Sequence, residues 1–146
     1  MNLFDHQTRV LFLCVGNSAR SQMAEAILRA KAGSLFEVYS AGLEPSEVRP
    51  EALAVLTEAG YSTEGLRSKG VDEYLGKIHF TYLVTVCSLA EDRCPRTWLP
   101  GGERLYWPID DPAAAEGAED ERMDAFRLAL RQIEAKIDDW LAEISE

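Results

Sequence analysis

The sequence has few cysteines and no long apolar run, and each shortage excludes a class of protein. Its three cysteines are an odd number, so a structural disulfide framework cannot use them all. In a reducing cytosol such thiols stay free, and each is a candidate for burial, metal binding or reaction. No apolar run could span a membrane, and residues 1–10 lack the apolar segment and cleavage site of a secretory signal. We therefore expect a cytoplasmic protein with free thiols.

Basic residues are also scarce. The chain has 15 Lys and Arg against 25 Asp and Glu, which gives a formal net charge of -10. Such a surface repels the phosphates of nucleic acids and the headgroups of anionic membranes, so we expect neither as a partner. It also repels small anions at long range. An anion site must therefore be built locally, from backbone N–H groups and a few well-placed cations.

Repeats, low-complexity tracts and Pro/Gly-rich linkers are absent as well. Hydrophobic residues make up 47% of the 146 residues and charged residues 27%, the balance of a globular protein. A chain of this length buries a core that needs neither a disulfide nor a metal to hold it. We expect one domain over residues 1–146, acting as a monomer.

Apolar segments with the lengths of strands alternate with helix-like segments. We expect strands at 9–15, 36–40, 81–86 and 104–107, and helices at 19–31, 51–59, 71–75 and 120–144. This alternation predicts an α/β fold with a parallel sheet and helices on both faces. Ligands of such sheets bind beyond the carboxyl ends of the strands. All three cysteines are expected on that rim.

The last helix carries an apolar stripe at alternating spacings of three and four residues. We interpret the stripe as core packing against the sheet rather than as an interface for a partner helix. Its members are Met123, Phe126, Leu130, Ile133, Ile137, Trp140 and Ile144.

One segment has the residues of an oxyanion site. It runs Cys14-Val15-Gly16-Asn17-Ser18-Ala19-Arg20-Ser21, after the first strand and into the first helix. A short loop before a helix can turn its N–H groups inward and make a nest for an anion. Gly16 permits backbone conformations that a side chain forbids. Arg20 can hold two oxygens of a tetrahedral anion with its planar fork.

The nucleophile in this site would be Cys14. The positive field of the loop is expected to lower its pKa, and Ser21 is expected to donate a hydrogen bond to the sulfur. The sulfur would then lie below the centre of the anion, placed for attack. The alternative is a buried cysteine beside an unrelated arginine. The order of strand, Gly-Asn-Ser turn and helix argues against that alternative.

The segment LFLCVGNSARSQMAEAIL resembles the active-site loop of low-molecular-weight tyrosine phosphatases, and more closely that of the thioredoxin-coupled arsenate reductases built on the same fold. The resemblance extends to YSAG at 39–42, VTVCSLAEDRCP at 84–95 and YWPIDDPA at 106–113. It implies a flavodoxin-like three-layer sandwich with a four-stranded parallel sheet in the order 2-1-3-4.

Cys87 and Cys94 distinguish the two branches of this family, because a phosphatase needs only Cys14 whereas a reductase must supply two electrons. A helix between the two would hold them roughly 10 Å apart, whereas a disulfide needs Cα atoms about 4.4–6.8 Å apart. We therefore expect residues 88–93 to form a loop or to rearrange on oxidation. Alternatively, Cys87 and Cys94 are two ordinary cysteines without a redox role. A zinc site is disfavoured because neither His6 nor His79 is close in sequence, so no metal is expected.

Asp110 and Asp111 precede Pro112 after the fourth strand. The resemblance implies that the aspartate directly before proline, Asp111, is the general acid that protonates the leaving oxygen. An aspartate that only forms a turn before proline is the alternative. Phosphatases of this fold typically follow the Asp-Pro pair with aromatic residues. Alanines at 113–115 remove that platform and favour a small inorganic substrate.

The resemblance implies reduction of arsenate by three cysteines. Arsenate binds residues 15–20, Cys14 attacks arsenic, Cys87 then attacks Cys14, and Cys94 attacks Cys87. Thioredoxin reduces the final disulfide, so an external thiol reductant and no bound cofactor is expected. A low-molecular-weight phosphatase working through a phosphocysteine at Cys14 is the main alternative, and weak phosphatase activity is expected in either case. A redox sensor without turnover is the third.

Reductases of this family often carry a cation site, and Asn17, Glu25 and Ser40 match its residues. The family's Thr-Ser-Asp segment aligns here with residues 68–70, Ser-Lys-Gly, so the aspartate is missing. Lys69 can supply its own positive charge at this place. We therefore expect no bound potassium ion.

Overall fold

The nearly continuous apolar run at residues 9–15 forms a central strand of the sheet. Such a strand is apolar throughout because both faces of the sheet are covered. The computed structural model describes residues 8–74, 76–93 and 102–144. Four strands in it form one parallel sheet in the order β2-β1-β3-β4. Their bounds are Thr8–Cys14 for β1, Phe36–Gly42 for β2, Tyr82–Thr85 for β3 and Glu103–Tyr106 for β4. The predicted order 2-1-3-4 is confirmed.

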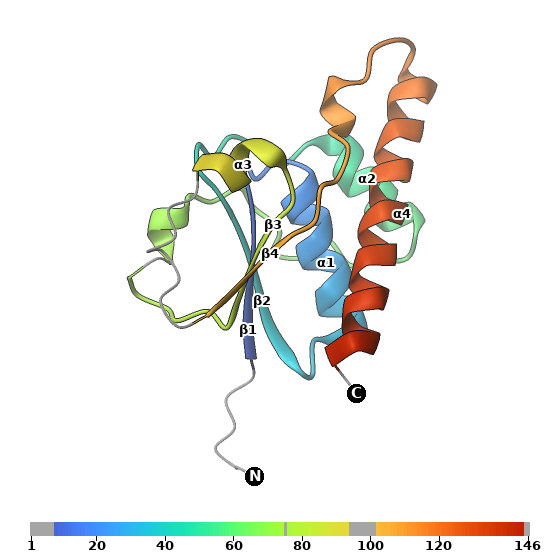
Figure 1. The fold of residues 1–146 in the computed structure, drawn as a ribbon. Coiled ribbons are helices and arrows are strands. Elements are labelled where there is room, and N and C mark those ends of the chain that lie inside the picture. The colour runs from blue at the N-terminus through green and yellow to red at the C-terminus, as the bar shows by residue number, and fades with distance from the viewer. Residues whose placement is uncertain (1–7, 75, 94–101, 145–146) are drawn as a thin grey trace.

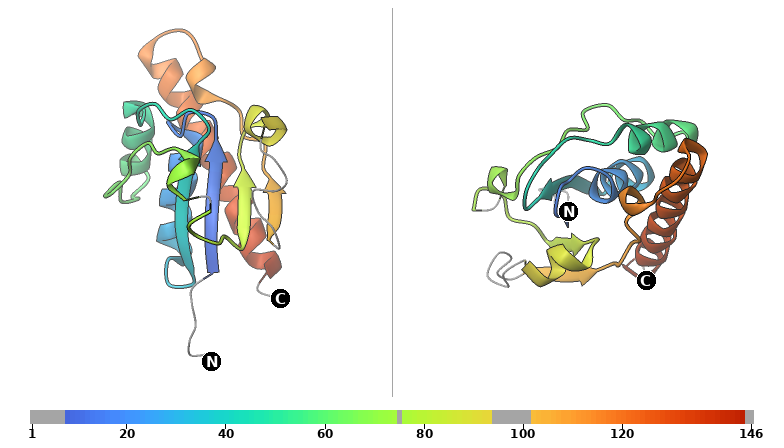
Figure 2. Two further views of the ribbon diagram at one scale, coloured as in Figure 1. Left: turned by 90° about the vertical axis from the view of Figure 1, so that its left-hand side faces the viewer. Right: turned by 90° about the horizontal axis from the view of Figure 1, so that it is seen from above.

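Helices cover both faces of the sheet. Figure 1 shows α1 and α4 on one face with α2 beside them, and α3 and the 3-10 turn η1 on the other; the view from above in Figure 2 agrees. Helices α1, α2 and α4 also contact one another. The bounds are α1 Arg20–Ala32, α2 Pro50–Glu58, η1 Val71–Glu73, α3 Ser88–Arg93, η3 Pro112–Ala114 and α4 Glu119–Ile144.

Aromatic contacts tie α4 to the sheet. The Trp140 ring lies 5.3 Å from that of Phe36 on β2 and 5.0 Å from that of Tyr82 on β3. It also meets Trp107, which follows β4, at 5.8 Å. The apolar stripe of α4 is therefore core packing, as predicted. Its last member, Ile144, is 39% exposed and lies outside the core.

The predicted elements all occur, with ends that differ by one or two residues. The clearest shift concerns the first strand, which ends at Cys14 rather than at Val15. Residues 88–93, expected to form a loop or to rearrange on oxidation, form the short helix α3, so that only the second alternative stays open. Their polar content suggested a surface segment, and the sequence carried no signal that separated a loop from one and a half helical turns. None of the helices within the described residues is long and apolar enough to cross a membrane.

Parallel strands bring the candidate residues to one rim. Cys14 ends β1 and Cys87 lies two residues after β3. The two strands are neighbours, and the N–H of Val86 donates to the Leu13 carbonyl at 3.0 Å. Asp111 follows β4 on the same side of the sheet. The predicted convergence of these loops is confirmed for the described residues, whereas Cys94 lies outside them.

Candidate functional site

A second backbone segment shapes the loop that follows β1. The N–H groups of residues 43, 44, 46 and 49 donate to the carbonyls of residues 14, 15, 16 and 18 at 2.8–3.2 Å. These bonds hold the four carbonyl groups toward the segment after β2. In a planar trans peptide the N–H points away from the carbonyl. The following N–H groups, on residues 15, 16, 17 and 19, are thereby turned toward the other side of the loop, as an anion nest requires.

Asn17 makes the sharpest bend of the loop. Its φ is 49°, the only positive φ of a residue other than glycine in the described chain. Asparagine tolerates this left-handed conformation better than most side chains. The bend turns the Asn17 N–H onto the Cys14 sulfur at 3.3 Å. The sequence assigned the conformational freedom to Gly16, and that prediction is wrong because the strained residue is its neighbour.

Gly42, at the end of β2, also shapes the loop. The sequence alone did not reveal this role. A Cβ added there would lie 2.5 Å from the Val15 carbonyl oxygen and 2.8 Å from the Asn17 nitrogen. Only glycine lets the two backbones approach this closely. The glycine closes the YSAG segment at 39–42, which was noticed as part of a resemblance but not as a steric requirement.

The Cys14 sulfur is buried, with the residue 4% exposed. Burial raises the pKa of the Cys14 thiol, hydrogen bonds from Ser21 and the Asn17 N–H lower it, and the nearby Cys87 raises it. The net direction is upward. The sequence predicted a lowered pKa because it counted the positive field of the loop and not the cost of removing a thiolate from water.

Ser21 lies in the first turn of α1, directly after the loop, and its Oγ is 2.9 Å from Cys14 Sγ. The Asn17 side-chain amide donates to the same Ser21 oxygen at 2.7 Å. A hydroxyl that already accepts a bond keeps its one hydrogen for another partner. The predicted contact between Ser21 and the sulfur is confirmed, and because a thiolate has no hydrogen to give, Ser21 is the donor once Cys14 is ionised.

The Asn17 side chain is saturated by four hydrogen bonds. Its Nδ2 donates to Ser21 and, at 3.0 Å, to Ser40 Oγ. Its Oδ1 accepts from Gln22 Nε2 at 2.9 Å and from the Lys69 N–H at 2.9 Å. Every donor and acceptor of the amide is used, so this network fixes both the orientation of the side chain and the bend that it carries.

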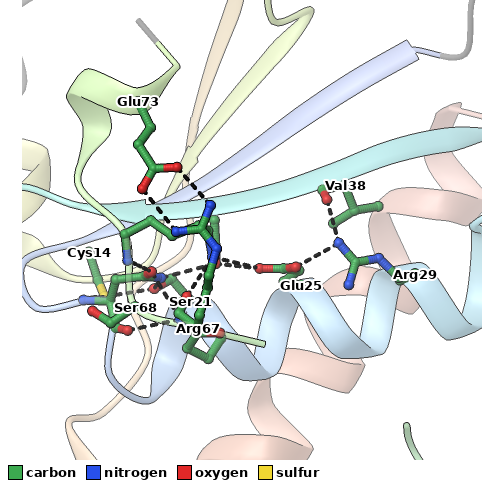
Figure 3. A network of polar contacts seen from close by, with 12 residues as sticks. Cys14, Ser21, Glu25, Arg29, Val38, Arg67, Ser68 and Glu73 are labelled. Atoms are coloured by element: carbon green, nitrogen blue, oxygen red, sulfur yellow. Dashed lines mark hydrogen bonds and ion pairs between the residues drawn. The ribbon is translucent and has the colours of Figure 1, made fainter. Parts of the chain in front are cut away.

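A buried carboxylate continues the network away from the sulfur. Glu25 Oε1 accepts from Ser40 Oγ at 2.5 Å and lies 3.5 Å from Lys69 Nζ. Glu25 Oε2 pairs with Arg29 at 2.6 Å, and Arg29 also donates to the Val38 carbonyl. Figure 3 shows Glu25 between Arg29 on one side and the group around Cys14 and Ser21 on the other. The two cations supply the pairing that a buried carboxylate requires.

Arg20 and Asp111 meet at the rim. The Arg20 side chain is 17% exposed, donates to the Ile109 carbonyl at 3.1 Å and lies 3.7 Å from Asp111 Oδ2. Asp111 also accepts from the Ala113 N–H and caps η3. Asp110 instead exchanges two hydrogen bonds with Gln132 of α4. The structure thus brings Asp111, and not Asp110, to the arginine of the loop.

Two of the three cysteines lie together. Cys87 is buried, 4% exposed, and its proximity raises the pKa of the Cys14 thiol. The helix α3 begins directly after it and ends at Arg93, which pairs with Glu44 of the segment beside the loop at 2.8 Å. Cys94 lies outside the described residues. Within those residues, no three His, Cys, Asp or Glu side chains cluster as metal ligands.

The chain is similar to known proteins over most of its length. The family of low molecular weight phosphotyrosine protein phosphatases matches residues 9–146. An arsenate reductase of Halalkalibacterium halodurans is 41% identical over 129 residues, which is 88% of this chain and 91% of that protein. A solved arsenate reductase in the phosphate binding state superimposes with a TM-score of 0.78 at 26% identity, over 94% of this chain and 99% of its own. A thioredoxin-dependent arsenate reductase of Corynebacterium glutamicum gives a TM-score of 0.61 at 31% identity, over 90% of this chain and 62% of its own.

Proposed function

Because this chain belongs to the low molecular weight phosphotyrosine protein phosphatase family, we propose that it reduces arsenate to arsenite with Cys14 as its nucleophile. The observation that carries the proposal is the second thiol. Cys87 is buried just after β3, the strand that neighbours the strand of Cys14, and its proximity raises the pKa of the Cys14 thiol. A phosphatase needs no thiol there, whereas a reductase needs one within reach of the first. The curated relatives named arsenate reductases support the same choice.

Arsenate would bind in the nest formed by residues 15–20. The N–H groups turned inward by the neighbouring segment would donate to its oxygens, and Arg20 would hold two of them with its fork. The sulfur of Cys14, which accepts from Asn17 and Ser21, would then attack arsenic. The bound dianion and the thiolate repel each other, so the donors of the loop have to offset both charges.

Asp111 would protonate the oxygen that leaves as the S–As bond forms. It lies on the same rim as the nest and 3.7 Å from Arg20, which would contact the same anion. Its side chain is 47% exposed, so it can recover its proton from solvent after each turnover.

Two electrons then pass from thiols to arsenic. The Cys87 thiolate would attack the Cys14 sulfur, the S–As bond would break, and its electron pair would leave with arsenic as arsenite. The product is a Cys14–Cys87 disulfide. Cys94 would attack Cys87 and free the Cys14 thiolate, which leaves a Cys87–Cys94 disulfide. We propose that an external dithiol protein of the thioredoxin class reduces it and that no cofactor is bound.

The short helix α3 sets a condition on this relay. The helix from residue 88 to residue 93 rises by about 7.5 Å along its axis, which exceeds the roughly 4.4–6.8 Å between the Cα atoms of a disulfide. We propose that α3 unwinds when the second disulfide forms. Six residues make a single short helix, whose loss costs few hydrogen bonds.

Hydrolysis of phosphomonoesters is the second candidate. The family description names phosphotyrosine phosphatases, and one structurally similar reductase was solved with phosphate bound. Phosphate and arsenate share shape and charge, so weak phosphatase activity from Cys14, Arg20 and Asp111 is expected. The segment after the Asp-Pro pair is the 3-10 turn Pro112–Ala114 and carries no aromatic ring, so a phenyl phosphate finds no platform there.

The decisive measurement is arsenate-dependent NADPH oxidation with thioredoxin and thioredoxin reductase present. Turnover in the wild type that is lost in Cys87→Ser and in Cys94→Ser supports the relay. Each cysteine variant should still hydrolyse an aryl phosphate slowly, which serves as the control for an intact nest. Aryl phosphate hydrolysis without any arsenate turnover in the wild type would make the chain a phosphatase. One disulfide formed per arsenate consumed separates a reductase from a redox sensor.

A further inference from the structure

The ammonium group of Lys69 lies in a cage of oxygen atoms beneath the loop. Its Nζ is 2.7 Å from the Arg67 carbonyl, 3.3 Å from Ser40 Oγ and 3.5 Å from Glu25 Oε1. The side chain is 4% exposed. An ammonium group has three N–H donors and no acceptor, and this cage presents three oxygens. The cage therefore matches the group that occupies it.

A separate monovalent cation does not fit these residues. Potassium prefers oxygen ligands, and the oxygens of Glu25, Ser40 and Arg67 that would serve it are already turned toward Lys69. A second positive charge would also lie directly beside the ammonium group, with one buried carboxylate to share between them. That carboxylate is further neutralised by Arg29. With Lys69 and Arg29 both beside Glu25, positive charge already exceeds negative charge here without an added ion.

Lys69 is connected to the loop in two ways. Its backbone N–H donates to Asn17 Oδ1. Its ammonium group donates to Ser40 Oγ, the oxygen that also accepts from Asn17 Nδ2. Ser40 in turn donates a hydrogen bond to Glu25. The donor and the acceptor of each hydrogen bond at Ser40 are therefore fixed. Both ends of the Asn17 amide are thus held by groups that Lys69 contacts.

We propose that Lys69 is a positioning residue whose ammonium group takes the place of a bound monovalent cation and keeps Asn17 and Ser21 aligned on the Cys14 sulfur. A tethered ammonium group cannot dissociate, so the alignment does not depend on the salt in solution. The chain therefore works at the same rate in potassium and in its absence. The inference rests on the proposed function, because it concerns the same nucleophile. The alignment of the donors on Cys14 is nevertheless measurable without arsenate.

The test compares two variants that empty the cage differently. Lys69→Ala removes the ammonium group and leaves room for an ion, whereas Lys69→Met removes the charge and fills the room with an apolar chain of similar length. The readout is the rate at which iodoacetamide alkylates Cys14, followed on its peptide by mass spectrometry. Each protein is assayed in choline, potassium and ammonium chloride at one ionic strength. Lys136→Ala, on the exposed side of α4, is the matched control.

In choline, Cys14 should react roughly tenfold more slowly in both Lys69 variants than in the wild type, the effect of one misaligned hydrogen bond to a thiolate. Potassium or ammonium should restore the rate in Lys69→Ala and leave Lys69→Met slow. The wild type and Lys136→Ala should not respond to the cation. A purely structural role would slow both variants equally in all three salts.

The proposal is overturned if wild-type alkylation accelerates in potassium, a result that needs no variant and so stands even if Lys69→Ala fails to fold. It is also overturned if Lys69→Ala matches the wild type in choline. Absence of arsenate turnover would leave these alkylation results unaffected and would count against the proposed function alone.

Discussion

The side-chain amide of Asn17 donates to the hydroxyl of Ser21 across 2.7 Å, and this bond leaves the Ser21 hydrogen free for the Cys14 sulfur. The Cys14 sulfur lies 2.9 Å from the same oxygen, and because a thiolate has no hydrogen, Ser21 is the donor once Cys14 ionises. A thiolate gains more from such a donor than a thiol does. Asn17 contacts the Cys14 sulfur only through its backbone N–H, but its side chain also acts on the sulfur through the Ser21 hydroxyl.

Replacing Ser21 by alanine should make Cys14 less reactive near neutral pH. The hydrogen bond from Ser21 lowers a pKa that burial raises, so its loss raises the pKa further. The acid limb of the alkylation rate against pH should move upward by about one to two pH units, because thiolate forms only at higher pH. Ser62→Ala, at an exposed serine, should leave the limb in place. An unchanged limb in Ser21→Ala would show that Ser21 does not donate to the sulfur.

Substitutions of Asn17 separate its two contributions. Asn17→Gly and Asn17→Ala both remove four side-chain hydrogen bonds, and both should lose most arsenate turnover. Alanine also pays for the positive φ of 49°, which glycine does not. Asn17→Ala should therefore be less stable than Asn17→Gly by about 1 kcal/mol in urea unfolding. Equal stability of the two would mean that the bend relaxes once the side-chain bonds are gone.

Gly42→Ala should displace the loop. Its Cβ would overlap the Val15 carbonyl oxygen and the Asn17 nitrogen, and overpacking of this kind costs about 1–3 kcal/mol. Turnover should fall more than stability suggests, because the displaced atoms belong to the anion nest. Gly76→Ala is the control: it has a positive φ but open space around it, so it should lose some stability and keep its turnover. Full activity in Gly42→Ala would contradict the close approach.

The two aspartates before Pro112 should behave differently. Asp111→Asn removes the carboxyl group beside Arg20 and should lower the rate of the arsenate step by a factor of about 10² or more. Asp110→Asn should change it little, because that side chain bonds Gln132 of α4. Single-turnover formation of the first disulfide measures the step without interference from the reductant. Equal losses in the two variants would argue against Asp111 as the acid.

The pattern of the sequence was sufficient to predict the fold class and the residues of the loop, whereas the sheet order was implied by the resemblance to a known family. The apolar run 9–15, the Gly-Asn-Ser turn and the following helix are local features, and local features survive in the primary pattern. The spacing of apolar residues along α4 likewise predicted which face of this helix is buried. The ends of elements were less certain, since propensities change gradually along the chain. For residues 88–93 the sequence left a loop and a rearrangement on oxidation as alternatives, because a short polar stretch suits a surface helix as well as a loop.

Contacts between residues far apart in the chain required the tertiary structure. Lys69 and Ser40 hold the Asn17 side chain by hydrogen bonds, and so support its positive φ. The loop after β1 lies so close to Gly42 that no side chain fits there. The pKa of Cys14 depends on burial, which a sequence does not display. The sequence by itself determined which chemical groups this protein has and at which rim of the sheet they lie. Only the tertiary structure decided the upward shift of the Cys14 pKa, the hydrogen-bond partners of Asn17 and the place of the Lys69 charge, because burial and distance arise when the chain closes on itself.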